Sequence, residues 1–152
     1  MKGILFTEFI ELVEEQFSIE MAEELIDECE LATGGAYTSV GSYDHGEFVR
    51  LRTRLSERSG VPVRDLLMSF GRRMFERFRG MYPEMFANAA APIEFLENVE
   101  AHIHVEVRKL YPDADLPRLA TRRLDPDTLE IEYRSSRGLG DLAEALVRGG
   151  AN

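Results

Sequence analysis

The stretch "LEIEYRSSRGLG" (residues 129–140) decides the fold class, because it is where helical periodicity has given way to strand alternation. Apolar and charged residues alternate up to Tyr133, as in a β-strand with one buried and one exposed face. The same alternation places Tyr133, Ser135 and Arg137 on one side. Such a row of donors suits an anionic ligand with two separated acceptors, and arginine can grip a carboxylate with two bonds. On spacing alone, a strand end that reaches solvent remains the simpler explanation.

Upstream of this stretch the chain has the pattern of helices separated by loops. The segment of residues 33–47 is rich in glycine and predicts a long loop, after which Asp44 and Glu47 resemble a capping box. Apolar residues at helical spacing predict helices over residues 4–17, 19–31, 44–58, 62–82 and 92–111.

Downstream of the helices the pattern is extended. "RLATRRL" and "TLEIEY" flank "DPD" at residues 125–127, which predicts an antiparallel hairpin. A last helix is expected over residues 138–147, ending at Gly149 and Gly150. We therefore predict a single α+β domain, with a helical part over about residues 1–111 and a sheet with a helix over about 112–152.

The composition bounds the function. A chain of 152 residues that is 44% hydrophobic and 30% charged can build one globular core. The 28 acidic and 18 basic residues give a net charge of −10, which disfavours nucleic acids and anionic membranes as partners. No apolar run approaches the roughly 20 residues that span a bilayer, and no signal peptide is recognisable, so we expect a cytoplasmic protein. The single cysteine, Cys29, excludes an internal disulfide and a multi-cysteine zinc site.

The three histidines offer the clearest candidates for a ligand. His45 fits a solvated residue of the glycine-rich loop. His102 and His104 point in nearly opposite directions on a helix, so they cannot chelate one ion together. At about 100° per residue His102 lies closer to the apolar stripe, although both can also be ordinary helix residues. The chain contains no phosphate loop, nucleophile elbow or HExxH motif, and we expect no enzymatic activity.

The combined motifs resemble the H-NOX (haem nitric oxide/oxygen binding) family, the sensor domain of bacterial gas sensors and of soluble guanylate cyclase. The chain opens with "MKG", and "YTSVGSY", "GRRMFERFRGMYPEMF" and "HVEVRKLYPDADLP" come in the family's order before the Y-x-S-x-R motif. A histidine also lies thirteen residues before a proline, as in the family. The resemblance covers essentially the whole chain, although family members usually continue for several more strands.

The resemblance implies a b-type haem between the helical part and the sheet part. Its iron would be bound by His104 and not by His102, because only His104 lies thirteen residues before Pro117. Pro117 would press on the porphyrin and distort it, and protein contacts of this kind tune a haem. The residues that the resemblance assigns to the two propionates are Tyr133, Ser135 and Arg137.

The resemblance also indicates which gas is bound. Oxygen-binding members place a tyrosine and further polar groups over the iron, whereas the matching positions here are apolar. Bound oxygen needs a hydrogen-bond donor and nitric oxide does not, so we predict a nitric oxide sensor, with carbon monoxide as a further gas ligand. An oxygen-binding H-NOX protein is the alternative, and it would require a donor such as Tyr37 or Tyr43. The matching gas-side positions are Leu142, Phe9 and Met74, and Phe78 is a further residue expected to contact the haem.

By the same resemblance, nitric oxide breaks the bond between iron and His104, and the haem flattens against Pro117. The output would pass to a separate effector, such as a histidine kinase or a diguanylate cyclase or phosphodiesterase. A cofactor-free interaction module is the alternative from another functional class. Arg134 and Ser136 lie between the row residues and are expected to be dispensable.

Overall fold

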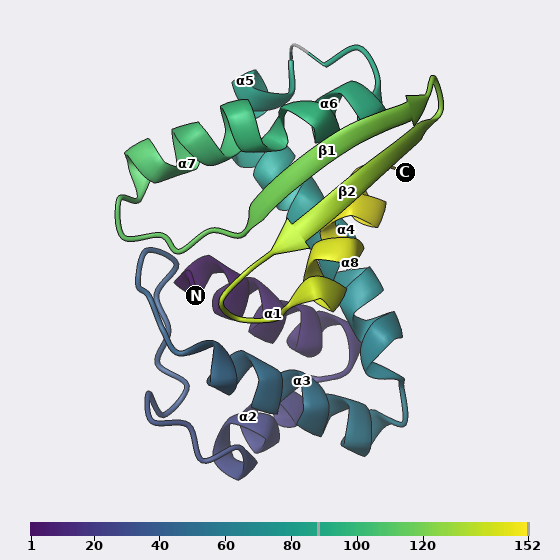
Figure 1. The fold of residues 1–152 in the computed structure, drawn as a ribbon. Helices are drawn as coiled ribbons and strands as arrows, with labels where there is room; N and C mark the ends of the chain where they lie inside the picture. The colour runs from purple at the N-terminus through teal and green to yellow at the C-terminus, as the bar shows by residue number, and fades with distance from the viewer. Residues whose placement is uncertain (88, 152) are drawn as a thin grey trace. The chain divides into compact units, whose positions relative to one another are not determined.

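The computed structural model describes residues 1–87 and 89–151 and confirms the α+β class (Figure 1). Helices dominate, and one two-stranded antiparallel sheet follows most of them. The elements in chain order are α1 (Gly3–Gln16), α2 (Ile19–Glu28), α3 (His45–Ser59), α4 (Val63–Met81), α5 (Pro83–Phe86), α6 (Pro92–Asn98), the π-helix η1 (Val99–Ile103), α7 (His104–Leu110), β1 (Arg118–Asp125), β2 (Thr128–Arg134) and α8 (Gly140–Ala151).

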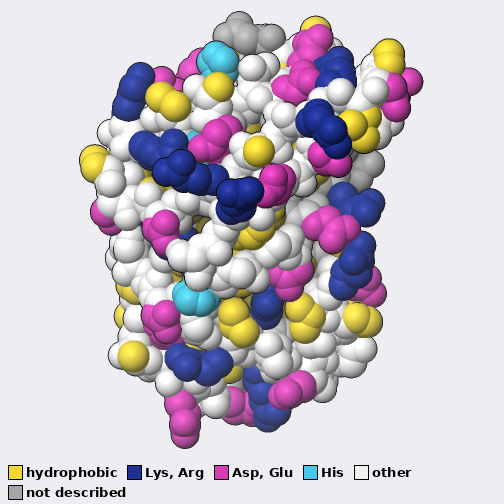
Figure 2. All heavy atoms as spheres, viewed as in Figure 1, with side chains coloured by type: hydrophobic (Ala, Val, Ile, Leu, Met, Phe, Trp, Pro, Cys, Tyr) yellow, Lys and Arg dark blue, Asp and Glu magenta, His cyan; other side chains and the backbone are white. Residues whose placement is uncertain are grey.

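The chain divides into two compact units, Met1–Phe70 and Gly71–Asn152. The boundary lies inside α4 and not near residue 111, where the sequence changes from helical to extended. The assignment of the chain to a single domain therefore stays a prediction. Among the residues that the structure describes, no helix combines the length and the apolar character needed to cross a membrane. Figure 2 shows acidic and basic side chains interspersed over the visible face.

The first unit is built around buried aromatic rings. Phe9 of α1 packs edge-on against Phe48 of α3 at a centroid distance of 5.2 Å and against Phe70 of α4 at 5.4 Å. All three side chains are fully buried, and Phe6 joins them. Such perpendicular aromatic pairs add to the stabilisation that burial of their apolar surface provides.

The loop before α3 is held by a buried carboxylate, and the predicted capping box is wrong. The side chain of Asp44 makes no capping hydrogen bond. Glu47 is instead buried, and its Oε1 accepts hydrogen bonds from the hydroxyl of Thr33 at 2.8 Å and the hydroxyl of Tyr37 at 3.2 Å. Because the loop supplies donors, Glu47 turns toward it and not back to the helix start. His45, expected in the loop, is the first residue of α3.

The hairpin of the second unit confirms the predicted strands and turn. Leu119 pairs with Tyr133 and Thr121 with Ile131, and the register shifts by a bulge before the turn. In the turn, a carboxylate oxygen of Asp125 accepts the backbone N–H of Asp127 at 2.9 Å. Side-chain bonds of this kind are typical of tight turns.

The predicted helix over residues 92–111 is interrupted by a π-turn. The backbone N–H of His104 donates to the carbonyl oxygen of Val99, five residues earlier, where an α-helix would use a residue four back. The hydrogen-bonded turn from Val99 to His104 therefore contains one residue more than a turn of an α-helix. Side chains after this turn face other directions than the sequence periodicity indicates.

Helix α8 does not end at Gly149 and Gly150 but continues through both, because it lies against α4. A Cβ atom on Gly71 would lie 2.3 Å from the carbonyl oxygen of Ala145, and one on Gly149 would lie 2.7 Å from the carbonyl oxygen of Gly71. Real Cβ atoms do not approach backbone this closely. Glycines are thus required where α4 and α8 cross within the second unit, and here they are packing residues and not terminators.

We expect Gly71→Ala to lower the free energy of unfolding by about 1–3 kcal/mol, because the added methyl group would push α8 away from α4. Gly80→Ala is the matched control on the same helix, since a Cβ atom there meets nothing within 4 Å. That control should be neutral or stabilising by about 0.5–1 kcal/mol, through helix propensity. Urea denaturation of the purified protein measures both, and equal effects would contradict the close crossing.

Candidate functional site

His104 is the histidine that turns inward. It follows the π-turn as the first residue of α7, and its side chain is only 12% exposed, whereas His102 is exposed. The periodicity of the sequence places His102 nearer the apolar stripe, but His102 is exposed in the structure, because the π-turn Val99–Ile103 shifts the phase of the helix. The histidine chosen from the family resemblance is therefore the one that the fold shields from solvent.

The Glu100 side chain fixes the imidazole of His104. Its Oε2 atom lies 2.8 Å from Nδ1 of His104, so with an ionised carboxylate the imidazole donates from Nδ1. That tautomer leaves the lone pair on Nε2, which is the arrangement found in metal-binding histidines. Burial raises the pKa of Glu100, but hydrogen bonds from His104 and Leu119 bring the pKa below its ordinary value.

Glu100 also holds the start of β1, just after Pro117. The backbone N–H of Leu119 donates to the same Oε2 atom at 3.1 Å, and a guanidinium nitrogen of Arg108 reaches the other carboxylate oxygen at 3.3 Å. One carboxylate thus connects the inward histidine with the strand that begins one residue after the half-buried Pro117.

A second connection lies on the other side of Pro117. Asp115 accepts a hydrogen bond from the hydroxyl of Ser136 at 2.9 Å, and the same oxygen lies 3.8 Å from a guanidinium nitrogen of Arg137. Pro117 therefore lies between two attachments, one through Leu119 to Glu100 and one through Asp115 to the segment after β2. The loop that carries Pro117 is restrained on both sides.

The polar row continues through a turn and not along the strand. Strand β2 ends at Arg134, and Ser135 accepts the backbone N–H of Arg137 on its hydroxyl at 3.1 Å. The expectation of one extended strand through Arg137 is wrong, because this side-chain bond bends the chain. The alternation survives nevertheless: Tyr133, Ser135 and Arg137 are half-buried, while Arg134 and Ser136 are exposed.

The apolar residues assigned to the gas side are distributed over three helices. Met74 and Leu142 are buried on α4 and α8 and border the crossing of these helices, and Phe78 is half-buried on α4. Phe9 belongs to the aromatic core of the first unit. All predicted site residues other than Phe9 therefore lie in the second unit.

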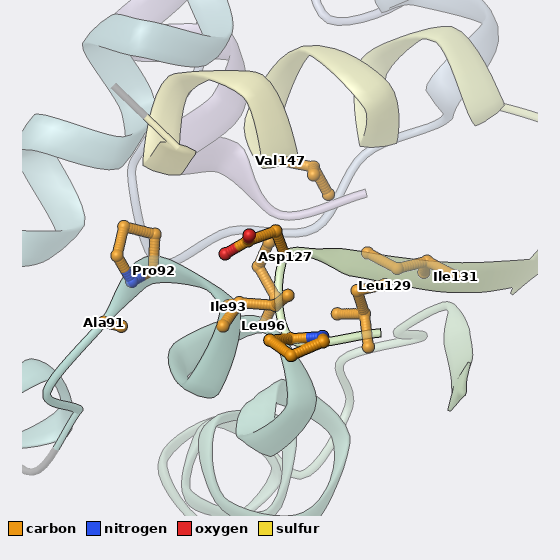
Figure 3. A pocket seen from close by; sticks show the side chains of 9 residues that line it. Ala91, Pro92, Ile93, Leu96, Asp127, Leu129, Ile131 and Val147 are labelled. Carbon is orange, nitrogen blue, oxygen red and sulfur yellow. The ribbon is translucent and has the colours of Figure 1, made fainter. Parts of the chain in front are cut away.

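A separate apolar pocket of about 420 Å³ lies in the second unit (Figure 3). It contains none of the predicted site residues, although Leu129 and Ile131 share a face of β2 with Tyr133. Its lining offers few polar groups, so it suits apolar packing and not an anionic ligand. The main lining side chains are Ile93 and Leu96 of α6, Leu129 and Ile131 of β2, and Val147 of α8.

Sequence reasoning missed Glu100, Asp115 and Ser136. Glu100 carried a usable signal, because a residue four positions before His104 lies on the same face of a helix. Asp115 and Ser136 are 21 positions apart in the sequence, and no local spacing connects them. Only the folded hairpin brings these two residues together.

Comparison with known proteins relates the whole chain to one family. The family model described as "Haem-NO-binding" matches residues 2–152. An H-NOX protein from K. algicida in the Fe(II) unliganded state is 41% identical, with a TM-score of 0.91, and the match covers 97% of this chain and 80% of that one. No curated protein matches.

Two further solved structures are similar. The H-NOX from Shewanella woodyi, in the Fe(II)CO state with IWP-051 bound, is 40% identical with a TM-score of 0.84, and the match covers 99% of this chain and 80% of that one. An H-NOX protein from S. oneidensis in the Fe(II)NO state is 26% identical with a TM-score of 0.89, over 99% of this chain and 83% of that one.

Ser136 is expected from the sequence to be dispensable, but its hydrogen bond to Asp115 predicts a role in restraining the loop of Pro117. Ser136→Ala removes one hydrogen bond, worth about 1 kcal/mol, so deuterium uptake by residues 112–117 should become about fivefold faster. Arg134→Ala is the control, because Arg134 pairs with the exposed Glu132 of its own strand. Hydrogen exchange with mass spectrometry checks both variants, and unchanged uptake in Ser136→Ala would show that the contact restrains nothing.

Proposed function

The chain belongs to the haem-NO-binding (H-NOX) family, and from this premise we propose that it senses nitric oxide through a ferrous b-type haem bound by His104. Domains of this family are haem-based gas sensors. The observation that carries the proposal is the shielded imidazole of His104, whose Nδ1 is occupied by Glu100 at 2.8 Å. Nε2 is thereby presented as the one basic nitrogen for an axial bond.

The other residues of the second unit fit the rest of a haem. Tyr133, Ser135 and Arg137 offer a phenol, a hydroxyl and a guanidinium, which suit two propionates. The Arg137 side chain is only 20% exposed, and the carboxylate beside it, that of Asp115, is 63% exposed. At 3.8 Å the carboxylate of Asp115 is beyond hydrogen-bond distance of this guanidinium nitrogen, so Arg137 has N–H donors to offer a further anion. Pro117 is held between its two attachments and would meet the macrocycle.

Four of the tyrosine hydroxyls already make hydrogen bonds within the protein, which supports nitric oxide over oxygen as the gas ligand. The hydroxyl of Tyr37 donates to Glu47. The hydroxyl of Tyr43 accepts the backbone N–H of Thr38 at 2.8 Å and lies 3.3 Å from the hydroxyl of Thr38, to which it can donate. The hydroxyls of Tyr82 and Tyr111 lie 3.3 Å apart and bond each other.

The sequence contains five tyrosines, and the remaining one, Tyr133, is among the residues that we assign to the propionates. The alternative donors Tyr37 and Tyr43 already serve the loop of the first unit. With Met74 and Leu142 apolar, we infer a gas side that offers bound oxygen no tyrosine.

A haem held by His104 would supply a ferrous iron that can take nitric oxide, and we infer that the signal would be the loss of the bond between this iron and His104. The residues of this chain determine how that loss is transmitted. Glu100 keeps His104 attached to the start of β1, so a displacement of the histidine pulls on the loop of Pro117. We propose that this change is read in the cytoplasm by a separate effector, such as a histidine kinase or a diguanylate cyclase or phosphodiesterase.

Absorption spectra test the proposed function. Ferrous protein reconstituted with haem should show a Soret band that air leaves unchanged over minutes and that nitric oxide shifts to the position of a five-coordinate complex. A stable oxygen complex would favour the oxygen-binding alternative. Failure to retain added haem would favour a cofactor-free interaction module and would overturn the proposal.

Replacement of each histidine tests the axial ligand. His104→Gly should abolish haem retention unless imidazole is supplied, because the cavity left by the side chain can hold the free ligand. His102→Gly is the matched control, since His102 is exposed and lies two residues away. Haem content after gel filtration, with and without imidazole, is the measurement. If His102→Gly lost the haem and His104→Gly kept it, the assignment would be wrong.

A further inference from the structure

We propose that Glu100 is a positioning residue that sets the strength of the bond between His104 and the haem iron, an inference that rests on the proposed function. Its carboxylate oxygen Oε2 lies 2.8 Å from Nδ1 of His104 and accepts a hydrogen bond from it. A carboxylate in this position fixes the tautomer and the orientation of the ring and makes the opposite nitrogen a stronger ligand.

Besides His104, two further donors hold the carboxylate of Glu100. Leu119 donates its backbone N–H to Oε2 at 3.1 Å, and Arg108 approaches Oε1 at 3.3 Å. The carboxylate also lies one helical turn before His104, inside the π-helix η1. Because several donors fix it, the carboxylate can orient the imidazole and not merely follow it.

The bond lies where solvent weakens it little. The side chain of His104 is 12% exposed and that of Glu100 is 33% exposed, whereas the pair of Arg134 and Glu132 is 75% and 55% exposed. Charge-assisted hydrogen bonds are stronger away from water. We therefore expect the loss of the contact between Glu100 and His104 to weaken the bond that His104 makes to the iron.

The expected consequence is a weaker iron–histidine bond when the carboxylate is removed. Glu100→Gln keeps the size and a neutral acceptor but loses the charge, and Glu100→Ala loses both. The imidazole then donates less electron density to the iron, so nitric oxide should displace His104 more readily. Loss of such an outer partner typically weakens metal binding about 10- to 100-fold, and we expect faster haem loss of at least about tenfold for Glu100→Ala.

Resonance Raman spectroscopy of the ferrous, haem-loaded protein tests this inference. The iron–histidine stretching frequency should fall in Glu100→Gln and further in Glu100→Ala. Glu106→Gln is the matched control, since Glu106 lies on α7, is 48% exposed and pairs with Lys109 at 2.8 Å. The frequency of this control should equal that of the unchanged protein.

An unchanged frequency in both Glu100 variants would overturn the role of Glu100 while leaving the haem sensor intact. If the unchanged protein bound no haem, the proposed function itself would fail. If Glu100→Ala alone failed to fold or to take up haem, the isosteric Glu100→Gln would decide the question. A purely structural role predicts a lower melting temperature with an unshifted frequency, and circular dichroism measures that temperature.

Discussion

The candidate site depends on one carboxylate that holds His104 and the start of β1 together. Glu100 accepts both the imidazole proton of His104 and the backbone N–H of Leu119, so helix and strand are held at a common atom. One carboxylate oxygen has two lone pairs and can accept both bonds, and the other oxygen faces Arg108, where the NH₂ group of an amide would meet a cation. The π-turn supports the arrangement, because it turns His104 toward the shielded side.

Pro117 gains its importance from this constraint. The segment that carries it is restrained on one side through Leu119 and Glu100, and on the other through Asp115 and Ser136. The first link is shielded and the second is exposed, so we expect the first to be the stronger. In the proposed switch, a change at His104 would therefore reach the segment of Pro117 through Glu100 and Leu119.

Much of the fold can be predicted from local patterns, but the key geometry cannot. Alternation predicted the hairpin, and helical spacing predicted most helices, since both signals lie within a few residues. Local spacing could not reveal that Gly149 continues a helix, because the reason is the backbone of Gly71. The turn at Ser135 and the π-turn before His104 break the assumed period, so periodicity placed the exposed His102, and not the shielded His104, nearer the apolar stripe. The family resemblance selected His104 because it counts thirteen residues to Pro117 and does not depend on the phase of the helix.

The central claim is that His104, oriented by Glu100, is the single axial ligand of a haem whose propionates meet Tyr133, Ser135 and Arg137. The most direct measurement is a crystal structure of the ferrous, haem-loaded protein. We expect iron bound by Nε2 of His104, with Nδ1 still hydrogen-bonded to the carboxylate of Glu100 and both propionates on Tyr133, Ser135 and Arg137. Iron bound by another residue, or propionates that point away from Arg137, would contradict it.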